Sequence, residues 1–268
     1  MQAEQSLHQG RPEEALAELQ AQVRKDPSNP KLRVFLFQLL AVLGQWERAI
    51  TQLQVAGELD AANLLMAQMY REAILCEVFR AEVFAGKRSP LIFGDPSPWI
   101  AFLVEALRLE AENRSSEAGA LRAQAFEQAP ATAGSVNGQS FEWMADADSR
   151  LGPVLEAIVN GRYYWIPLQC VRRLEVEEPA DLRDVVWMPA QFTWANGGGA
   201  SGLIPTRYAA TENATDSLLL LSRRTEWQEL ADGAYKGLGQ RILATNNEDY
   251  ALMDVREIGF EPASSEVA

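Results

Sequence analysis

Two aspartates form the strongest candidate for chemistry in this sequence. Asp146 and Asp148 lie two residues apart in the stretch ADADSR, directly after a run that favours a β-strand. Carboxylates at this spacing could share a divalent cation or serve in acid–base catalysis. The EF-hand pattern is not completed, and aspartate-rich connections commonly form turns and caps. The two interpretations are a metal-dependent or hydrolytic enzyme that uses this pair, and a structural junction in which Arg150 pairs with one aspartate.

Other patterns of catalytic residues are missing from the sequence. His8 is the only histidine, and helical spacing places it in the first helix. Ser-His-Asp and Cys-His arrangements and histidine-based zinc sites are therefore excluded. The run GGGASG (Gly197–Gly202) lacks the lysine and the following helix of a phosphate-binding loop, and is interpreted as a flexible hairpin tip. We expect no catalytic residue, no bound metal and no cofactor.

Composition and charge limit the partners of this chain. Cys76 and Cys170 have no CxxC partner, which predicts buried free thiols in a reducing compartment. No apolar run reaches the roughly 20 residues that cross a bilayer, and the first ten residues lack the features of a secretory signal. The net charge is −13, which disfavours nucleic acid and anionic membranes as partners. We expect a cytoplasmic protein.

A repeat of 34 residues organises the first part of the chain. The stretch GRPEEALAELQAQVRKDP at residues 10–27 returns as GQWERAITQLQVAGELDA at residues 44–61. This period, with its glycine, alanine and proline positions, is typical of tetratricopeptide helix pairs. Glycine ends the first helix of each pair, and the alanines Ala15 and Ala49 are small because two helices approach closely there. The same spacing places Ala118 in a later pair.

The helical pattern extends to about residue 130. Residues 63–86 keep helical spacing without a glycine at the expected turn, so one long helix and two shorter ones both fit. Residues 87–98 contain three prolines and a glycine and are expected to form a loop. Residues 99–130 form a further helix pair. We therefore predict an N-terminal domain over residues 1–130, a tetratricopeptide-like α–α superhelix.

After residue 130 the sequence favours strands. Asn-Gly lies between β-favouring runs at residues 137–138 and 160–161, which predicts two tight hairpins. Further strand candidates follow, and residues 214–227 fit either a helix or a strand. Of the seven tryptophans, five lie here, and we expect most in the core with one or two exposed. The prediction is a C-terminal domain over residues 131–268, a small, barrel-like antiparallel β domain of α+β type.

Several of these stretches resemble a known family. The sequence segments ADADSRLGPVLEAIVNGRYYWIP, DLRDVVWMPAQFTWANGG, GLIPTRY and GLGQRILATNNEDYALMDVREI follow a helical NPKLRVFLFQLLAVLGQWERA. Together they are similar to the ImpE family, also called TagJ or SciE-type, over nearly the whole chain. The resemblance implies a non-enzymatic, cytoplasmic accessory protein of a bacterial type VI secretion system. It also implies contact with the N-terminal helix of the small sheath subunit, TssB, and a link to the disassembly ATPase, ClpV.

A partner-binding surface is predicted on the helical repeats. Stacked helix pairs leave a concave groove that commonly takes a peptide or an amphipathic helix. In the second pair, the spacing of the inner face selects Lys31, Val34, Gln38 and Ala41. In the alternative, the long helix from residue 63 or the β domain fills this groove within the chain. A further alternative function is an assembly adaptor unrelated to secretion, with the acidic β domain meeting a basic partner.

Overall fold

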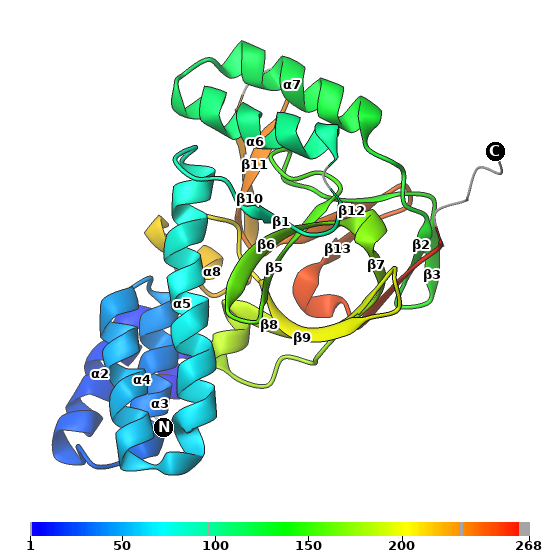
Figure 1. Ribbon diagram of the computed structural model, residues 1–268. Coiled ribbons are helices and arrows are strands. Elements are labelled where there is room, and N and C mark those ends of the chain that lie inside the picture. The colour runs from blue at the N-terminus through cyan, green and yellow to red at the C-terminus, as the bar shows by residue number, and fades with distance from the viewer. Residues whose placement is uncertain (1, 96, 231–232, 263–268) are drawn as a thin grey trace.

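The structure is a computed structural model that describes residues 2–95, 97–230 and 233–262. Helices fill most of the first half of the chain and strands most of the second (Figure 1). The α-helices are α1 (Gln2–His8), α2 (Pro12–Lys25), α3 (Pro30–Val42), α4 (Trp46–Leu59), α5 (Leu64–Phe84), α6 (Pro98–Ala111), α7 (Ser115–Gln128) and α8 (Ser217–Leu220). Short 3₁₀ turns join other elements: η1 (Ala61–Asn63), η2 (Leu168–Cys170), η3 (Leu182–Val185), η4 (Thr211–Asn213) and η5 (Leu252–Asp254).

The turns between the first helices follow from the sequence repeat. Gly10 and Gly44 have φ angles of +73° and +64°, a region of backbone conformation that glycine adopts at little cost. The side chain of Asn29 accepts hydrogen bonds from the backbone N–H groups of Lys31 and Leu32 and so caps α3. These local signals set the helices α1 to α4 as two consecutive hairpins.

Small residues bring the paired helices together. Ala15, Ala49 and Ala118 are each 0% exposed, which confirms the prediction that they lie at close helix contacts. Their neighbours on the same faces, Leu19 and Leu53, are also buried. Burying this apolar stripe supplies most of the driving force for stacking the helices.

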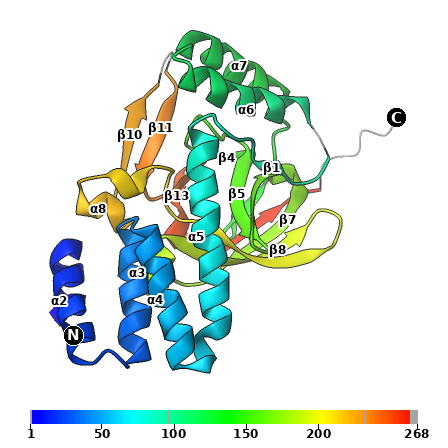
Figure 2. The ribbon, with the colours of Figure 1, turned by 60° about the vertical axis from the view of Figure 1, so that its left-hand side comes forward.

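The segment from residue 64 forms one helix of 21 residues, α5, which decides between the two alternatives left open by the sequence. Figures 1 and 2 show α5 standing between α3 and α4 on one side and the sheet on the other. Tyr70, Ala73 and Ile74 are buried along its length. At its end, Gly86 lies so close to α6 that an added Cβ would be 2.8 Å from the carbonyl oxygen of Leu107. The hairpin of α6 and α7 therefore lies across the end of α5.

Within the described residues, nine strands form the main sheet in the order β1-β6-β5-β9-β8-β7-β14-β2-β3. Neighbouring strands are antiparallel except for β1 and β6, which are parallel. Two smaller sheets pair β10 with β11 and join β13, β12 and β4. The strands are β1 (Leu91–Ile92), β2 (Gly134–Val136), β3 (Gln139–Phe141), β4 (Met144–Asp146), β5 (Val154–Val159), β6 (Arg162–Pro167), β7 (Val171–Val176), β8 (Trp187–Trp194), β9 (Gly199–Pro205), β10 (Thr225–Glu229), β11 (Tyr235–Gly239), β12 (Ile242–Thr245), β13 (Asp249–Ala251) and β14 (Glu257–Phe260).

The predicted fold class is confirmed: a tetratricopeptide-like helical region precedes an antiparallel-rich α+β region. Over the described residues the main sheet is open, because no pairing joins its edge strands β1 and β3, so the barrel-like sheet does not close. The proline-rich segment at residues 87–98 is more than a loop, since β1 within it pairs with β6. A strand of only two residues between prolines is too short to be predicted from the sequence pattern.

The two Asn-Gly pairs form the predicted hairpin turns. Asn137 and Gly138 have φ angles of +48° and +82°, and Asn160 and Gly161 have +50° and +69°. These values suit the primed turns that match the twist of paired strands. The glycine run at residues 197–202 is only partly a hairpin tip, because β9 already begins at residue 199. Residues 214–227 divide between both readings, with the short α8 followed by the start of β10.

The five tryptophans of this region divide as expected. Trp165, Trp187 and Trp194 are buried, whereas Trp143 and Trp227 are each 41% exposed. Cys76 is a buried free thiol, and the free thiol of Cys170 is half-buried.

The helical and sheet regions share one apolar core. The helices end with α7 at residue 128, and the sheet begins with β2 at residue 134. Phe37 and Ile74 from the helices belong nevertheless to the same buried cluster as Trp165 and Trp187 from the sheet. The division into two domains between residues 130 and 131 stays a prediction.

We predict that enlarging the alanine contact destabilises the fold. Ala49→Leu inserts three carbon atoms into a contact that is 0% exposed, so the free energy of unfolding should fall by about 1–3 kcal/mol. Urea unfolding followed by circular dichroism measures this loss. Gln54→Leu, on the exposed face of the same helix, is the matched control. Equal stability of the two variants would contradict close packing at Ala49.

Candidate functional site

The two aspartates singled out by the sequence are buried, and each binds an arginine. Asp148 is 0% exposed and accepts hydrogen bonds from Arg150, whose Nε lies 2.9 Å from Oδ1. This contact confirms the pairing of Arg150 with an aspartate. Asp146 is 4% exposed and binds the guanidinium of Arg241. It also accepts a hydrogen bond of 2.9 Å from the backbone N–H of Asp148. Both carboxylates are therefore paired with arginines of the same chain.

Glu156 on β5 is the centre of a larger buried ion network. Arg80 from α5 binds it with two parallel hydrogen bonds, at 2.6 Å from Nε to Oε1 and 2.9 Å from Nη2 to Oε2. Arg241 binds the same carboxylate from the other side, and the Tyr163 hydroxyl donates to it. The side chains of Arg80, Glu156 and Arg241 are 3%, 0% and 0% exposed. Charges buried to this degree are retained because each one is paired.

A second layer of hydrogen bonds holds the network in place. Arg80 also contacts Glu77 one turn earlier, with 3.2 Å from Nη1 to Oε2, and Glu77 accepts a hydrogen bond of 3.0 Å from the Trp187 indole. Arg80 further donates to the carbonyl oxygen of Arg207 at 2.9 Å. The Arg207 side chain in turn donates to the carbonyl of Val42 at the end of α3, at 2.8 Å. These contacts tie α3 and α5 to the sheet.

The two carboxylates that share Arg241 have opposite pKa shifts. Burial alone would raise the pKa of Glu156, but Arg80 and Arg241 together outweigh it and lower that pKa to about 2. For Asp146, burial outweighs the single arginine, and the nearby charge of Asp148 adds to it, so its pKa is raised to about 7. Glu156 therefore carries the stable negative charge of the network.

The network has the properties of a structural strut. Its carboxylates accept hydrogen bonds from arginines, from a tyrosine hydroxyl and from backbone N–H groups. Within the described residues, no three His, Cys, Asp or Glu side chains gather as metal ligands do. Its hydrogen bonds and ion pairs hold α5 against the sheet.

The helical residues predicted to bind a partner lie at a groove between α1, α3 and η3. Lys31, Val34 and Gln38 line this groove, which has a volume of about 870 Å³. Lys31 is exposed and Val34 is half-buried, whereas Gln38 is 7% exposed. Ala41 is 0% exposed and lies deeper, in the apolar core.

One wall of the groove comes from the sheet region. Residues 180–182, which lead into η3, form this wall. The guanidinium of Arg183 stacks over the Tyr70 ring of α5 at 4.8 Å and holds η3 in place. The β region thus narrows the groove, while Lys31 and Val34 remain at its surface.

Exposed apolar side chains of α5 form a second candidate surface, which was not predicted from the sequence. Leu65 is 84% exposed, the largest value among the exposed apolar side chains of the described residues. Four more apolar side chains of α5 are about half exposed: Leu64 at 55%, Met69 at 45%, Leu75 at 49% and Val78 at 46%. We call these five residues the α5 stripe. Such exposed apolar groups commonly mark protein contacts.

The α5 stripe lies where a repeat is incomplete. Helices α1 to α4 form two pairs, and α5 begins a third pair without a second helix packed beside it in the usual manner, because α6 and α7 lie at its far end (Figure 1). Stacked repeats require a polar outer face on the terminal unit. The missing glycine turn near residue 78 was the sequence signal for this surface. The α5 stripe and the groove adjoin in sequence, since Asn63 lines the groove.

No helix of the described residues has the length and apolar character needed to span a bilayer.

Comparisons with known proteins agree with both parts of the fold. A family model described as ImpE protein matches residues 138–259, and a tetratricopeptide repeat model matches residues 6–73. The type VI secretion system accessory component TagJ of Pseudomonas aeruginosa is 53% identical over 265 residues, which cover 98% of this chain and 92% of that protein. A crystal structure of a Vibrio parahaemolyticus protein superposes with a TM-score of 0.89, covering 98% of this chain and 99% of that chain at 24% identity. This last likeness supports the fold alone.

We predict that the network depends strongly on Arg80. Arg80→Met leaves Glu156 buried with one cation fewer, and breaking a buried pair costs about 3–5 kcal/mol of unfolding free energy. Chemical unfolding measures the loss. The control is Arg108→Met, which removes an exposed arginine that pairs with Glu105 and Glu112, and little change is expected there. Similar stabilities of the two variants would show that the network contributes little to the free energy of unfolding.

We predict that Asp146 makes the free energy of unfolding depend on pH. The pKa of Asp146 is about 7 in the folded state and about 3.9 in an unfolded chain. The folded state therefore holds this proton more tightly, and its stability falls as the pH rises from about 4 to 7. Relative to Asp146→Asn, the wild type should lose on the order of a few kcal/mol across that window.

Urea unfolding at several pH values checks this expectation. Glu156, with its lowered pKa, contributes stability that is full above about pH 4.3 and is lost as the pH falls toward 2. Its effect therefore lies below the pH range in which Asp146 acts. Asp249→Asn, at an exposed position, is the control. Parallel stability curves for wild type and Asp146→Asn would contradict the raised pKa.

Proposed function

The chain belongs to the ImpE family, and from that premise we propose that it is a non-enzymatic accessory component of a bacterial type VI secretion system. The relative TagJ, 53% identical over nearly the whole chain, supports the accessory role. The engagement of Asp146 and Asp148 by arginines supports a function other than catalysis. The single observation that carries the proposal is the α5 stripe, a set of exposed apolar side chains at the open end of a repeat array.

The partner is proposed to be the small sheath subunit of the system, a TssB-like protein, bound through its N-terminal helix. A helix with one apolar face suits a repeat array whose last unit lacks its second helix. A link to the ClpV-type disassembly ATPase is part of the same proposal, as is a cytoplasmic location. The net charge of −13 opposes a role on nucleic acid or on an anionic membrane.

The contact is proposed for the α5 stripe and for the adjoining groove at Lys31 and Val34. In this arrangement the apolar face of the partner helix covers Leu65 and Met69. Gln38 and Ala41 support the groove from below, since both are buried. A few fully desolvated side chains near the centre of such a contact carry most of the binding energy.

We predict that a single charge introduced on this surface weakens binding of the sheath subunit. A synthetic peptide with the N-terminal helix of the TssB-like subunit of the same secretion system should bind the full chain in isothermal titration calorimetry. Leu65→Asp places a charge in the apolar contact and should weaken binding at least about tenfold, as should Val34→Asp in the groove. Loss with Leu65→Asp alone would place the helix on the stripe only.

The matched control is Leu218→Asp, an apolar-to-charged change at a position 37% exposed on α8. Binding should be unchanged in this variant. Unaltered affinity in both Leu65→Asp and Val34→Asp would overturn the proposed surface. Heat on titration with Mg²⁺ or Ca²⁺ that disappears in Asp148→Asn would instead favour the metal-dependent alternative.

A further inference from the structure

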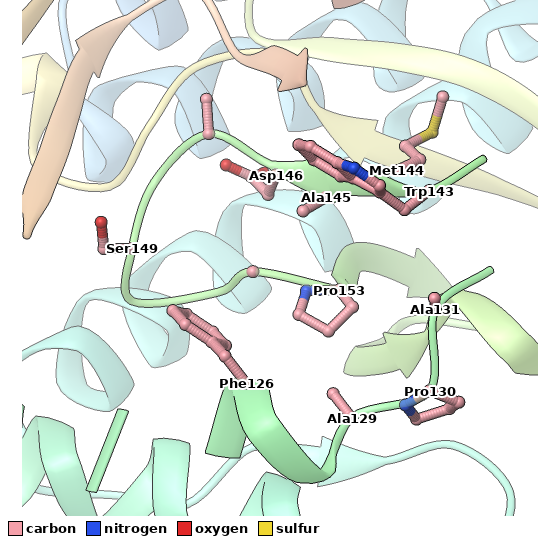
Figure 3. A pocket seen from close by; sticks show the side chains of 12 residues that line it. Phe126, Ala129, Pro130, Ala131, Trp143, Met144, Ala145, Asp146, Ser149 and Pro153 are labelled. Atoms are coloured by element: carbon pink, nitrogen blue, oxygen red, sulfur yellow. The ribbon is translucent and has the colours of Figure 1, made fainter. Parts of the chain in front are cut away.

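A cleft follows one side of α7, at the opposite end of α5 from the groove. Two hollows form it, with volumes of about 300 and 490 Å³, and both are lined by Phe126 and Ser149. Figure 3 shows the first hollow, with Phe126 on one side, Trp143 on the other and Pro153 between them. Phe126 and Trp143 are 40% and 41% exposed, so two aromatic rings flank the hollow without covering it, and Asp146 and Ser149 also line it.

The second hollow is lined by small residues of α7. Ser116, Gly119, Ala120 and Ala123 recur at helical spacing and form one wall. Side chains of this size let another chain approach closely to the helix backbone. On the far wall lie Ser149 and the residues Gly233 and Ala234 before β11.

A buried arginine lines the second hollow with part of its hydrogen-bonding capacity unused. Arg122 is 3% exposed, and its Nη2 lies 3.0 Å from Oε1 of Glu110 on α6. Its Nε and Nη1 have no hydrogen-bond partner among the residues that the structure describes. Buried N–H groups of a guanidinium are costly when unpaired, because they have lost water without gaining an acceptor. Arg122 therefore lacks acceptors for the N–H groups of Nε and Nη1.

We propose that this cleft binds an extended peptide segment of another protein, with a large apolar side chain between Phe126 and Trp143 and a carboxylate on Arg122. The carboxylate supplies the missing acceptor, and hydrogen bonds between charged groups are the stronger kind. A phosphate fits less well, because Glu110 already offsets the charge of Arg122 and would repel a dianion.

The geometry favours an extended segment. Arg122 and Phe126 are four residues apart on α7, which corresponds to about 6 Å along a helix. Two residues of extended chain span about the same distance. On the other wall, β4 is an edge strand of its small sheet, with β12 as one neighbour and an isolated bridge between Asp146 and Gly152 on its other side. The matching motif is an acidic residue two positions from a large apolar one.

The test uses two peptides that differ in one group. The probe is acetyl-Gly-Glu-Ala-Phe-Gly-amide, and the comparison peptide has Gln in place of Glu. Titration of each into the full chain is followed by calorimetry and by tryptophan fluorescence, since Trp143 lines the hollow. We expect the Glu peptide to bind at least about tenfold more tightly than the Gln peptide.

Variants assign the two contacts. Arg122→Gln should remove the preference for Glu while leaving the weaker binding of the Gln peptide. Ala123→Trp fills the second hollow and should abolish binding of both peptides. Gln124→Trp, at the adjacent exposed position, is the matched control and should bind as wild type does. If Arg122→Gln does not fold, Ala123→Trp and Gln124→Trp still decide the location.

Three results would overturn the proposal. The first is equal affinity of the two peptides for the wild type, and the second is no binding of the Glu peptide at millimolar concentration. The third is a dimer in sedimentation that Ala123→Trp dissociates, since a second copy would then cover the cleft. None of these results bears on the sheath-subunit contact, because Leu65 and Val34 lie on other elements.

Discussion

The fold depends on the burial of Glu156 between Arg80 and Arg241. Three charged side chains with 0–3% exposure are stable together only when every charge has its partner. Arg80 comes from a helix, and the other two residues come from the sheet region, so the network forms only when α5 lies against the sheet. α5 still packs against α4 as the first helix of a third pair, but α6 and α7 lie at its far end and leave the α5 stripe without a covering helix. The buried ion network thus accounts for the junction of the helical and sheet regions.

The parts of the fold that follow from short-range rules could be predicted from the sequence. Gly44 and Asn29 end or begin helices through backbone geometry and capping, which involve residues only a few positions away. The Asn160–Gly161 turn fixes the β5–β6 hairpin in the same manner. The repeat also predicted the burial of Ala15 and Ala49, because a period of 34 residues repeats the packing as well as the helices.

The rest of the site could not be predicted, since it depends on residues far apart in the chain. Arg80 and Glu156 are 76 positions apart, and Arg241 is 85 positions from Glu156. Nothing local distinguishes Arg80 from an arginine on a solvated face. Asp146 and Asp148 were recognisable as unusual, but the sequence does not reveal whether a cation or an arginine faces them. The α5 stripe was hidden for a similar reason, because its exposure reflects where α6 and α7 do not lie.

The position of α5 also relates the two proposed contacts. The stripe begins near the first residue of α5, and the hairpin that carries the Phe126 cleft packs at its last residues (Figures 1 and 2). A helix of 21 residues is about 30 Å long. A partner on Leu65 and Met69 and a partner in the Phe126 cleft would therefore not compete for space, and the buried ion network would hold them at a fixed separation. A rigid spacer between two protein contacts needs no reactive centre, which fits carboxylates that are all committed to arginines within the network.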